Sequence, residues 1–159
     1  MVRTRAPRGQ TPTLREWLTW DHLSAISAIT PTGELYLSLQ ERAFNGEDVV
    51  RFLQQLLDHL PGKLLVEWDG IGVHRSRAVK EFLAIGAGQR LWIEPLPGYV
   101  PELNPDEGIW SYLKRVELRN LVCHNLEHLR SEVEQAVERL KQRPDVIRGC
   151  IKEPGCYTF

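Results

Sequence analysis

The stretch Leu64-Leu65-Val66-Glu67-Trp68-Asp69-Gly70 decides the fold, because it has the pattern of a buried strand that ends in a carboxylate and a glycine. A short apolar run bounded by turn residues is typical of such strands. Ligands of open α/β sheets bind at the carboxyl ends of the strands, which is where Asp69 falls. We therefore expect an α/β fold with a metal ligand at Asp69, and Glu67 is a second candidate ligand. The alternative is a turn in which the Asp69 carboxylate bonds nearby backbone amides.

A second carboxylate, Glu107, lies in the stretch Leu103-Asn104-Pro105-Asp106-Glu107-Gly108-Ile109-Trp110. Two-metal phosphoryl-transfer sites need carboxylates from separate elements that converge on one point. Glu107 also has a structural explanation. With Asn104 as the cap of a helix, it can complete a capping box by accepting a hydrogen bond from the cap residue's own amide. The charge of Asp106 likewise suits a helix N-terminus.

The flanking sequence predicts alternating strands and helices. Residues 22–30 and 34–40 alternate in polarity around a Pro-Thr-Gly turn, which favours an antiparallel hairpin. Residues 63–69 and 90–94 are expected to be strands. Helices are expected after four capping residues, Asn45, Ser76, Asn104 and Asn125. The last helix should end or kink at Pro144. Three tryptophans lie in apolar periodic segments and are expected in the core: Trp68, Trp92 and Trp110.

Composition restricts the class of protein. With 159 residues, 42% of them hydrophobic, and five tryptophans, the chain predicts one domain with a substantial core. The net charge of −1 gives no overall attraction to nucleic acid, although Arg3, Arg5 and Arg8 make the N-terminus locally basic. Three cysteines without a CxxC pair indicate a reducing compartment. No apolar run approaches the ~18 residues of a membrane span, and no secretory signal is evident, so we expect a cytoplasmic protein.

Basic and histidine side chains near the two acids are accessory candidates. His74 follows Asp69 by one short loop, and it is a candidate to contact a phosphate or to polarise the attacking group. The alternative is a structural hydrogen-bond donor. Lys114, with Arg115 and Arg119, follows Glu107 along its expected helix. These side chains either contact phosphate or form a solvated basic face.

The chain closely resembles the catalytic domain of DDE-type transposases at Trp68-Asp69-Gly70, His74, the block from Leu96 to Trp110 and Leu113-Lys114-Arg115. The resemblance is to bacterial insertion-sequence transposases of the mariner-like superfamily, also called DDE superfamily endonucleases. It implies an RNase H-like mixed sheet flanked by helices. It also implies that Asp69 and Glu107 are the second and third acids of a catalytic triad that holds two Mg²⁺ or Mn²⁺ ions. The implied partners are transposon-end and target DNA, in a nucleoid-associated location.

The resemblance also implies that an acid is missing from this sequence. In such proteins the first aspartate lies on a first strand, shortly before the segment that matches Arg8 to Pro12, whereas this sequence starts at Met1. We therefore expect an N-terminal arm or remnant over residues 1–20 and a truncated catalytic domain over residues 21–159, inactive alone. It would act as a homo-oligomer or with another transposase fragment. The alternatives are a non-catalytic module that pairs with full-length transposase and a general RNase H-like nuclease.

Overall fold

The computed structural model describes residues 22–98 and 103–152. Its strands are β1 (Ser24–Ile29), β2 (Leu35–Gln40), β3 (Leu64–Trp68) and β4 (Leu91–Pro95). Its α-helices are α1 (Gly46–His59), α2 (Arg77–Ala84), α3 (Pro105–Tyr112), α4 (Leu126–Lys141) and α5 (Pro144–Lys152). Short 3₁₀ turns occur at η1 (Gly72–Arg75) and η2 (Ala87–Gln89), and a π-helical turn, η4 (Leu113–Glu117), extends α3. The alternation of strands and helices confirms the predicted mixed α/β class.

The predicted hairpin forms from β1 and β2, which pair antiparallel with Ser27 opposite Leu37. Its turn is closed by hydrogen bonds from the Thr30 amide to the Glu34 carbonyl and from the Gly33 amide to the Thr30 carbonyl. Gly33 has φ of 93°, the left-handed conformation that such three-residue loops require. The turn therefore sets the register of the hairpin.

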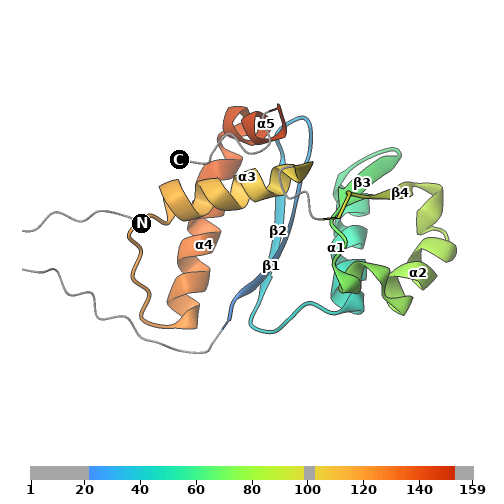
Figure 1. The fold of residues 1–159 in the computed structure, drawn as a ribbon, viewed down its shortest axis with the longest axis horizontal. Coiled ribbons are helices and arrows are strands. Elements are labelled where there is room, and N and C mark those ends of the chain that lie inside the picture. The colour runs from blue at the N-terminus through green and yellow to red at the C-terminus, as the bar shows by residue number, and fades with distance from the viewer. Residues whose placement is uncertain (1–21, 99–102, 153–159) are drawn as a thin grey trace, which may run out of the picture.

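The strands pair as two separate ladders. β3 runs parallel to β4, with Val66 opposite Ile93, whereas β1 pairs with β2. Within the described residues, no strand joins these two-stranded sheets to each other. Figure 1 shows the hairpin in the middle of the molecule, with α3, α4 and α5 to one side and α1, α2, β3 and β4 to the other.

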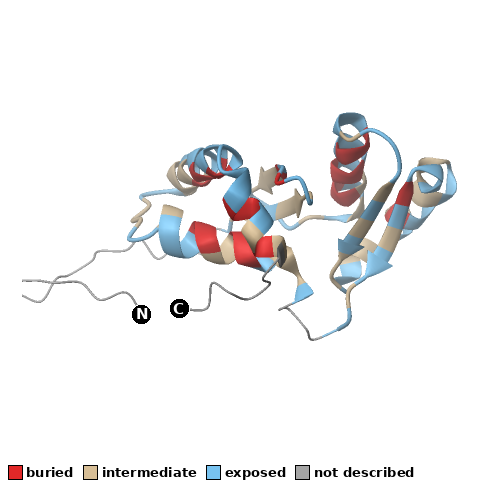
Figure 2. Ribbon diagram, turned by 90° about the horizontal axis from the view of Figure 1, so that it is seen from above, coloured by how far each residue is buried: buried red, intermediate tan, exposed pale blue. Residues whose placement is uncertain are grey.

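Two apolar cores lie on opposite faces of the hairpin. Leu35, Leu37 and Leu39 pack with the core formed by α3, α4 and α5. Ile26, Ala28 and Tyr36 pack with the core formed by α1, α2, β3 and β4. Figure 2 shows the buried residues gathered on α1 at one end and on the C-terminal helices at the other. Because successive side chains of the strands point to opposite faces, the hairpin contributes to both cores and joins the two halves of the domain.

The predicted helix caps all form. The side chains of Asn45, Ser76, Asn104 and Asn125 each accept a hydrogen bond from an amide in the first turn of the following helix. At α1 the arrangement is a full capping box, in which the Asp48 carboxylate in turn accepts a hydrogen bond from the Asn45 amide.

The C-terminal helix α5 is an element that the sequence did not predict. The preceding helix α4 ends at Lys141, just before Pro144, as expected, and Pro144 then begins a further helix, where its missing amide costs no hydrogen bond. Val146, Ile147 and Cys150 of this helix are buried in the core of α3 and α4. The packing of this apolar face stabilises a short helix that its length alone would leave marginal.

Trp92 corrects an expectation from the sequence. Its side chain is 67% exposed, beside Leu65 at 62%, on the face of the β3–β4 pair that α1 and α2 do not cover. Trp68 and Trp110 are partly buried, as expected. In the part of the chain that the structure describes, no helix is both long and apolar enough to cross a bilayer.

Candidate functional site

Asp69 directly follows β3 and is held by a histidine from the next turn. Nδ1 of His74 lies 3.1 Å from the Asp69 carboxylate and 3.1 Å from the Asp69 carbonyl oxygen. Because both atoms only accept hydrogen bonds, Nδ1 carries the proton. The imidazole also stacks on Trp68, with ring centroids 4.4 Å apart. His74 therefore makes a structural hydrogen bond of the kind weighed for it, and its other candidate role, contact with a phosphate, stays a prediction.

The Asp69 carboxylate is only partly used by these contacts. Its Oδ1 accepts a 3.3 Å hydrogen bond from the Ile71 amide, so the turn weighed as an alternative does form. No hydrogen bond within the described residues reaches Oδ2, and the side chain remains 41% exposed. One carboxylate oxygen is thus held, and the other has no partner among the described residues, an arrangement compatible with both the turn and a ligand site.

Glu107 lies in the first turn of α3, but not as a capping-box residue. The Asn104 side chain caps the amide of Asp106, and among the described residues no side-chain hydrogen bond joins Glu107 to the Asn104 amide. The residue is exposed. Its carboxylate therefore extends from a helix N-terminus with both oxygens free of hydrogen bonds in the described part of the chain.

Unlike Glu107, the neighbouring Asp106 uses its carboxylate in side-chain hydrogen bonds. Its Oδ2 accepts a 2.6 Å hydrogen bond from the Ser27 hydroxyl of β1 and a 3.0 Å bond from the indole N–H of Trp110. Its Oδ1 is buried and has no hydrogen-bond partner in the described structure. Desolvation by burial raises the pKa of Asp106, and the negative charges of Glu107 and Asp69 raise it further.

Besides burial, the negative charges of Asp69, at the end of β3, and Glu107, on α3, both raise the pKa of the Asp106 carboxyl. Within the described residues, however, no cluster of three or more histidine, cysteine, aspartate or glutamate side chains has metal-binding geometry.

Lys114 is exposed on the π-helical turn that extends α3, and it makes no ion pair within the described residues. Turns of this kind occur mostly as single insertions in α-helices, often at functional sites. The position leaves the ammonium group free to meet a phosphate.

The sequence did not identify Ser27 or the hydrogen-bonding role of Asp106. Ser27 is a polar residue in an otherwise apolar strand, and Trp110 follows Asp106 by one helical turn. Both features are visible in the sequence, but no local sequence pattern predicts that β1 contacts α3.

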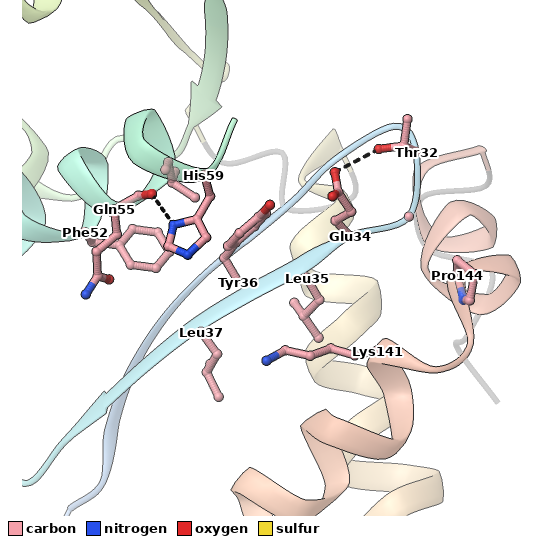
Figure 3. Close-up of a pocket in the computed structure, with 12 residues that line it drawn as sticks. Thr32, Glu34, Leu35, Tyr36, Leu37, Phe52, Gln55, His59, Lys141 and Pro144 are labelled. Carbon is pink, nitrogen blue, oxygen red and sulfur yellow. Dashed lines mark hydrogen bonds between the residues drawn. The ribbon is translucent and has the colours of Figure 1, made fainter. Parts of the chain in front are cut away.

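A separate hollow lies at the outer edge of β2, with a volume of about 610 Å³. Figure 3 shows it between α1, which contributes Phe52 and His59, and the junction of α4 and α5, which contributes Lys141. The polar groups there are engaged: His59 contacts the Gln55 carbonyl and Lys141 pairs with Glu138. This hollow contains none of the predicted site residues.

Comparison with known proteins places the chain in a family. A family model described as DDE superfamily endonuclease matches residues 2–130. The chain belongs to the DDE superfamily endonucleases. A search of curated proteins found no match.

Solved structures show that this DDE endonuclease chain shares the fold of a mariner transposase. The Mos1 mariner paired-end complex with Mn matches over 97% of this chain at 17% identity, with a TM-score of 0.59. The Mos1 paired-end complex with the left transposon end matches over 96% at 16% identity, with a TM-score of 0.61. This chain spans 51% of the transposase in each complex. The catalytic domain of Mos1 matches over 83% of this chain and 79% of its own length, at 15% identity and a TM-score of 0.53. The expected RNase H-like fold is thereby confirmed.

Proposed function

We propose that this chain is part of a DDE transposase that cleaves and joins DNA phosphodiesters, with Asp69 and Glu107 as ligands of divalent cations. The observation that carries the proposal is that Asp69, at the end of β3, and Glu107, at the start of α3, both keep carboxylate oxygens without a hydrogen-bond partner in the described structure, and both lie within the residues that match the DDE endonuclease family. Convergence of carboxylates from separate elements is what two-metal phosphoryl transfer requires.

The donor atoms suit Mg²⁺ or Mn²⁺. Mg²⁺ takes hard oxygen ligands, and it is commonly held by one or two carboxylates while it keeps several waters. Oδ2 of Asp69 and both oxygens of Glu107 are free for this purpose in the described structure. When bound, a cation pair would activate the attacking oxygen and stabilise the leaving oxygen. A third acid must then come from outside the described residues, because these contain no three-ligand cluster.

The remaining residues have supporting roles in the proposal. His74 holds Asp69 through its carboxylate and its carbonyl, which keeps the ligand in one orientation. Lys114 would contact a DNA phosphate from the π-helical turn. The Mos1 complexes contain transposon-end DNA and, in one case, Mn, which supports DNA as the partner and a divalent metal as the cofactor. A cytoplasmic, nucleoid-associated location follows from such a substrate.

The test measures Mn²⁺ binding by the 159-residue chain and its variants with isothermal titration calorimetry. Asp69→Asn and Glu107→Gln should each weaken Mn²⁺ binding about ten-fold or more, because each removes one charged ligand. Glu127→Gln is the matched control, since Glu127 is an exposed acid in the first turn of another Asn-capped helix. Circular dichroism should show that all three variants keep their helices. Unchanged Mn²⁺ affinity in both site variants would refute the assignment.

A second candidate function is a non-catalytic module that pairs with a longer transposase. The observation in its favour is that each of the four strands has one strand partner within the described residues, so each leaves one edge available for pairing. Inhibition of full-length transposase by this chain, unaffected by Asp69→Asn, would favour this function over catalysis.

A further inference from the structure

We propose that Asp106 is a positioning residue that, through Ser27 and Trp110, fixes the first turn of α3 on β1 and so sets where Glu107 stands relative to Asp69. This inference rests on the proposed function, because it concerns the same divalent-cation site. It assigns a role to a residue that lies beside the expected ligand but is not itself expected to bind the metal.

The first support is geometric. The Ser27 hydroxyl donates to Asp106 at 2.6 Å, and this side-chain bond joins β1 to the start of α3. The Trp110 indole donates to the same oxygen at 3.0 Å, which ties Asp106 to the next turn of its own helix. Glu107 is the next residue, and its side chain has no hydrogen bond in the described structure, whereas its amide donates to the Asn104 carbonyl. Its place is therefore set by the anchored residue before it.

The second support is chemical. An amide oxygen would accept the same two hydrogen bonds from Ser27 and Trp110, so this link does not need a charged group. Both donors are neutral and both bonds end on Oδ2, so alanine at this position would remove the link whereas asparagine would keep it.

Groups that orient metal ligands from outside the coordination shell are known to affect metal affinity strongly. Loss of the link between Ser27, Asp106 and Trp110 should therefore weaken divalent-ion binding at Glu107.

The experiment compares Asp106→Asn, Asp106→Ala and Ser27→Ala in the 159-residue chain by Mn²⁺ titration and thermal unfolding. Asp106→Asn keeps the acceptor oxygen and should bind Mn²⁺ like the unmodified chain. Asp106→Ala and Ser27→Ala break the link and should each weaken Mn²⁺ binding about ten-fold. A purely structural role for Asp106 would instead lower the melting temperature of Asp106→Ala and leave its Mn²⁺ affinity unchanged, and weaker Mn²⁺ binding by Asp106→Asn would assign the effect to the charge and not to the link.

Two variants serve as matched controls. Asp145→Asn removes an exposed acid that follows the first proline of α5, as Asp106 follows the first proline of α3. Ser24→Ala removes a hydroxyl from the same strand as Ser27. Both should bind Mn²⁺ like the unmodified chain.

Amide line broadening by Mn²⁺ in ¹⁵N-resolved NMR spectra gives a direct view of position. In the unmodified chain, Mn²⁺ should broaden the amides of both Asp69 and Glu107. In Ser27→Ala, broadening near Asp69 should persist and broadening at Glu107 should weaken. Unmodified Mn²⁺ affinity in Ser27→Ala and Asp106→Ala, with Asp69→Asn and Glu107→Gln still impaired, would overturn this inference alone. If Asp69→Asn and Glu107→Gln also bind normally, the proposed function fails and the inference fails with it.

Discussion

At the scale of single residues, Asp48 and Asp106 show how the surroundings change the pKa of an aspartate side chain. Both lie in the first turn of a helix. The hydrogen bond from Arg42, followed by the bond from the Asn45 amide, holds the pKa of Asp48 well below its usual range. Burial raises the pKa of Asp106 instead. The difference follows from their partners, since Asp48 meets a guanidinium at 2.6 Å and Asp106 meets only neutral donors.

Asp48→Asn should therefore lower the stability of the chain at neutral pH. The lowered folded-state pKa means that the contribution of Asp48 is fully present above the unfolded pKa of about 3.9 and is lost as the pH falls through the folded pKa. The variant should melt a few degrees below the unmodified chain at pH 7, and this gap should narrow below about pH 4. Thermal unfolding across pH is the measurement. A gap that does not change with pH would contradict the role given to the charge.

At the scale of elements, the hairpin turn illustrates a contact between distant segments. The backbone at Gly33 has φ of 93°, and a Cβ placed there would come within 2.6 Å of the Pro144 carbonyl oxygen. The turn between β1 and β2 therefore packs directly against the start of α5. Arg148 of the same helix adds a 3.2 Å hydrogen bond to the Thr32 carbonyl.

Gly33→Ala should destabilise the chain more than Gly62→Ala does. Gly62 also has a positive φ, of 80°, but a Cβ there would meet nothing within 4 Å, so it isolates the conformational cost of roughly 1–2 kcal/mol. Gly33→Ala carries that cost and a clash with the Pro144 backbone, for which overpacking adds about 1–3 kcal/mol. Urea unfolding of the two variants gives the comparison. Equal losses of unfolding free energy in the two variants would show that the hairpin turn does not pack tightly against α5.

At the scale of the whole molecule, the hairpin joins two apolar cores while the strands remain in two sheets. This arrangement leaves edges of β1 and β3 without a strand partner in the described residues. A strand paired at either edge would satisfy backbone groups, and it would bring a further side chain toward Asp69.

We expect the 159-residue chain to cleave DNA at most weakly, because its described residues offer two candidate ligands where two-metal sites need more. A chain extended at its N-terminus by a strand that ends in aspartate should show Mg²⁺-dependent nicking and a higher melting temperature. The assay is strand cleavage of DNA that carries the element's ends. The extended chain with Asp69→Ala is the control and should be inactive. Strong cleavage by the short chain that depends on Asp69 would mean that another acid, such as Asp21, completes the site.

Local signals predicted much of this structure. The strand before Asp69, the hairpin turn and the four helix caps depend on contacts within a few residues, so Asn45, Ser76, Asn104 and Asn125 could be identified from sequence. The family resemblance carried by the block around Glu107 is also a property of the sequence, and the family match bears it out.

Long-range packing decided the rest. Ser27 and Asp106 are 79 positions apart, and no periodicity brings β1 to the start of α3. Trp92 is exposed because no described element covers its face of the sheet, although its own segment has the pattern of a buried strand. Pro144 begins a helix because Ile147 and Cys150 find buried positions against α3 and α4. In each case the deciding free energy comes from groups remote in sequence, which only the tertiary structure brings together.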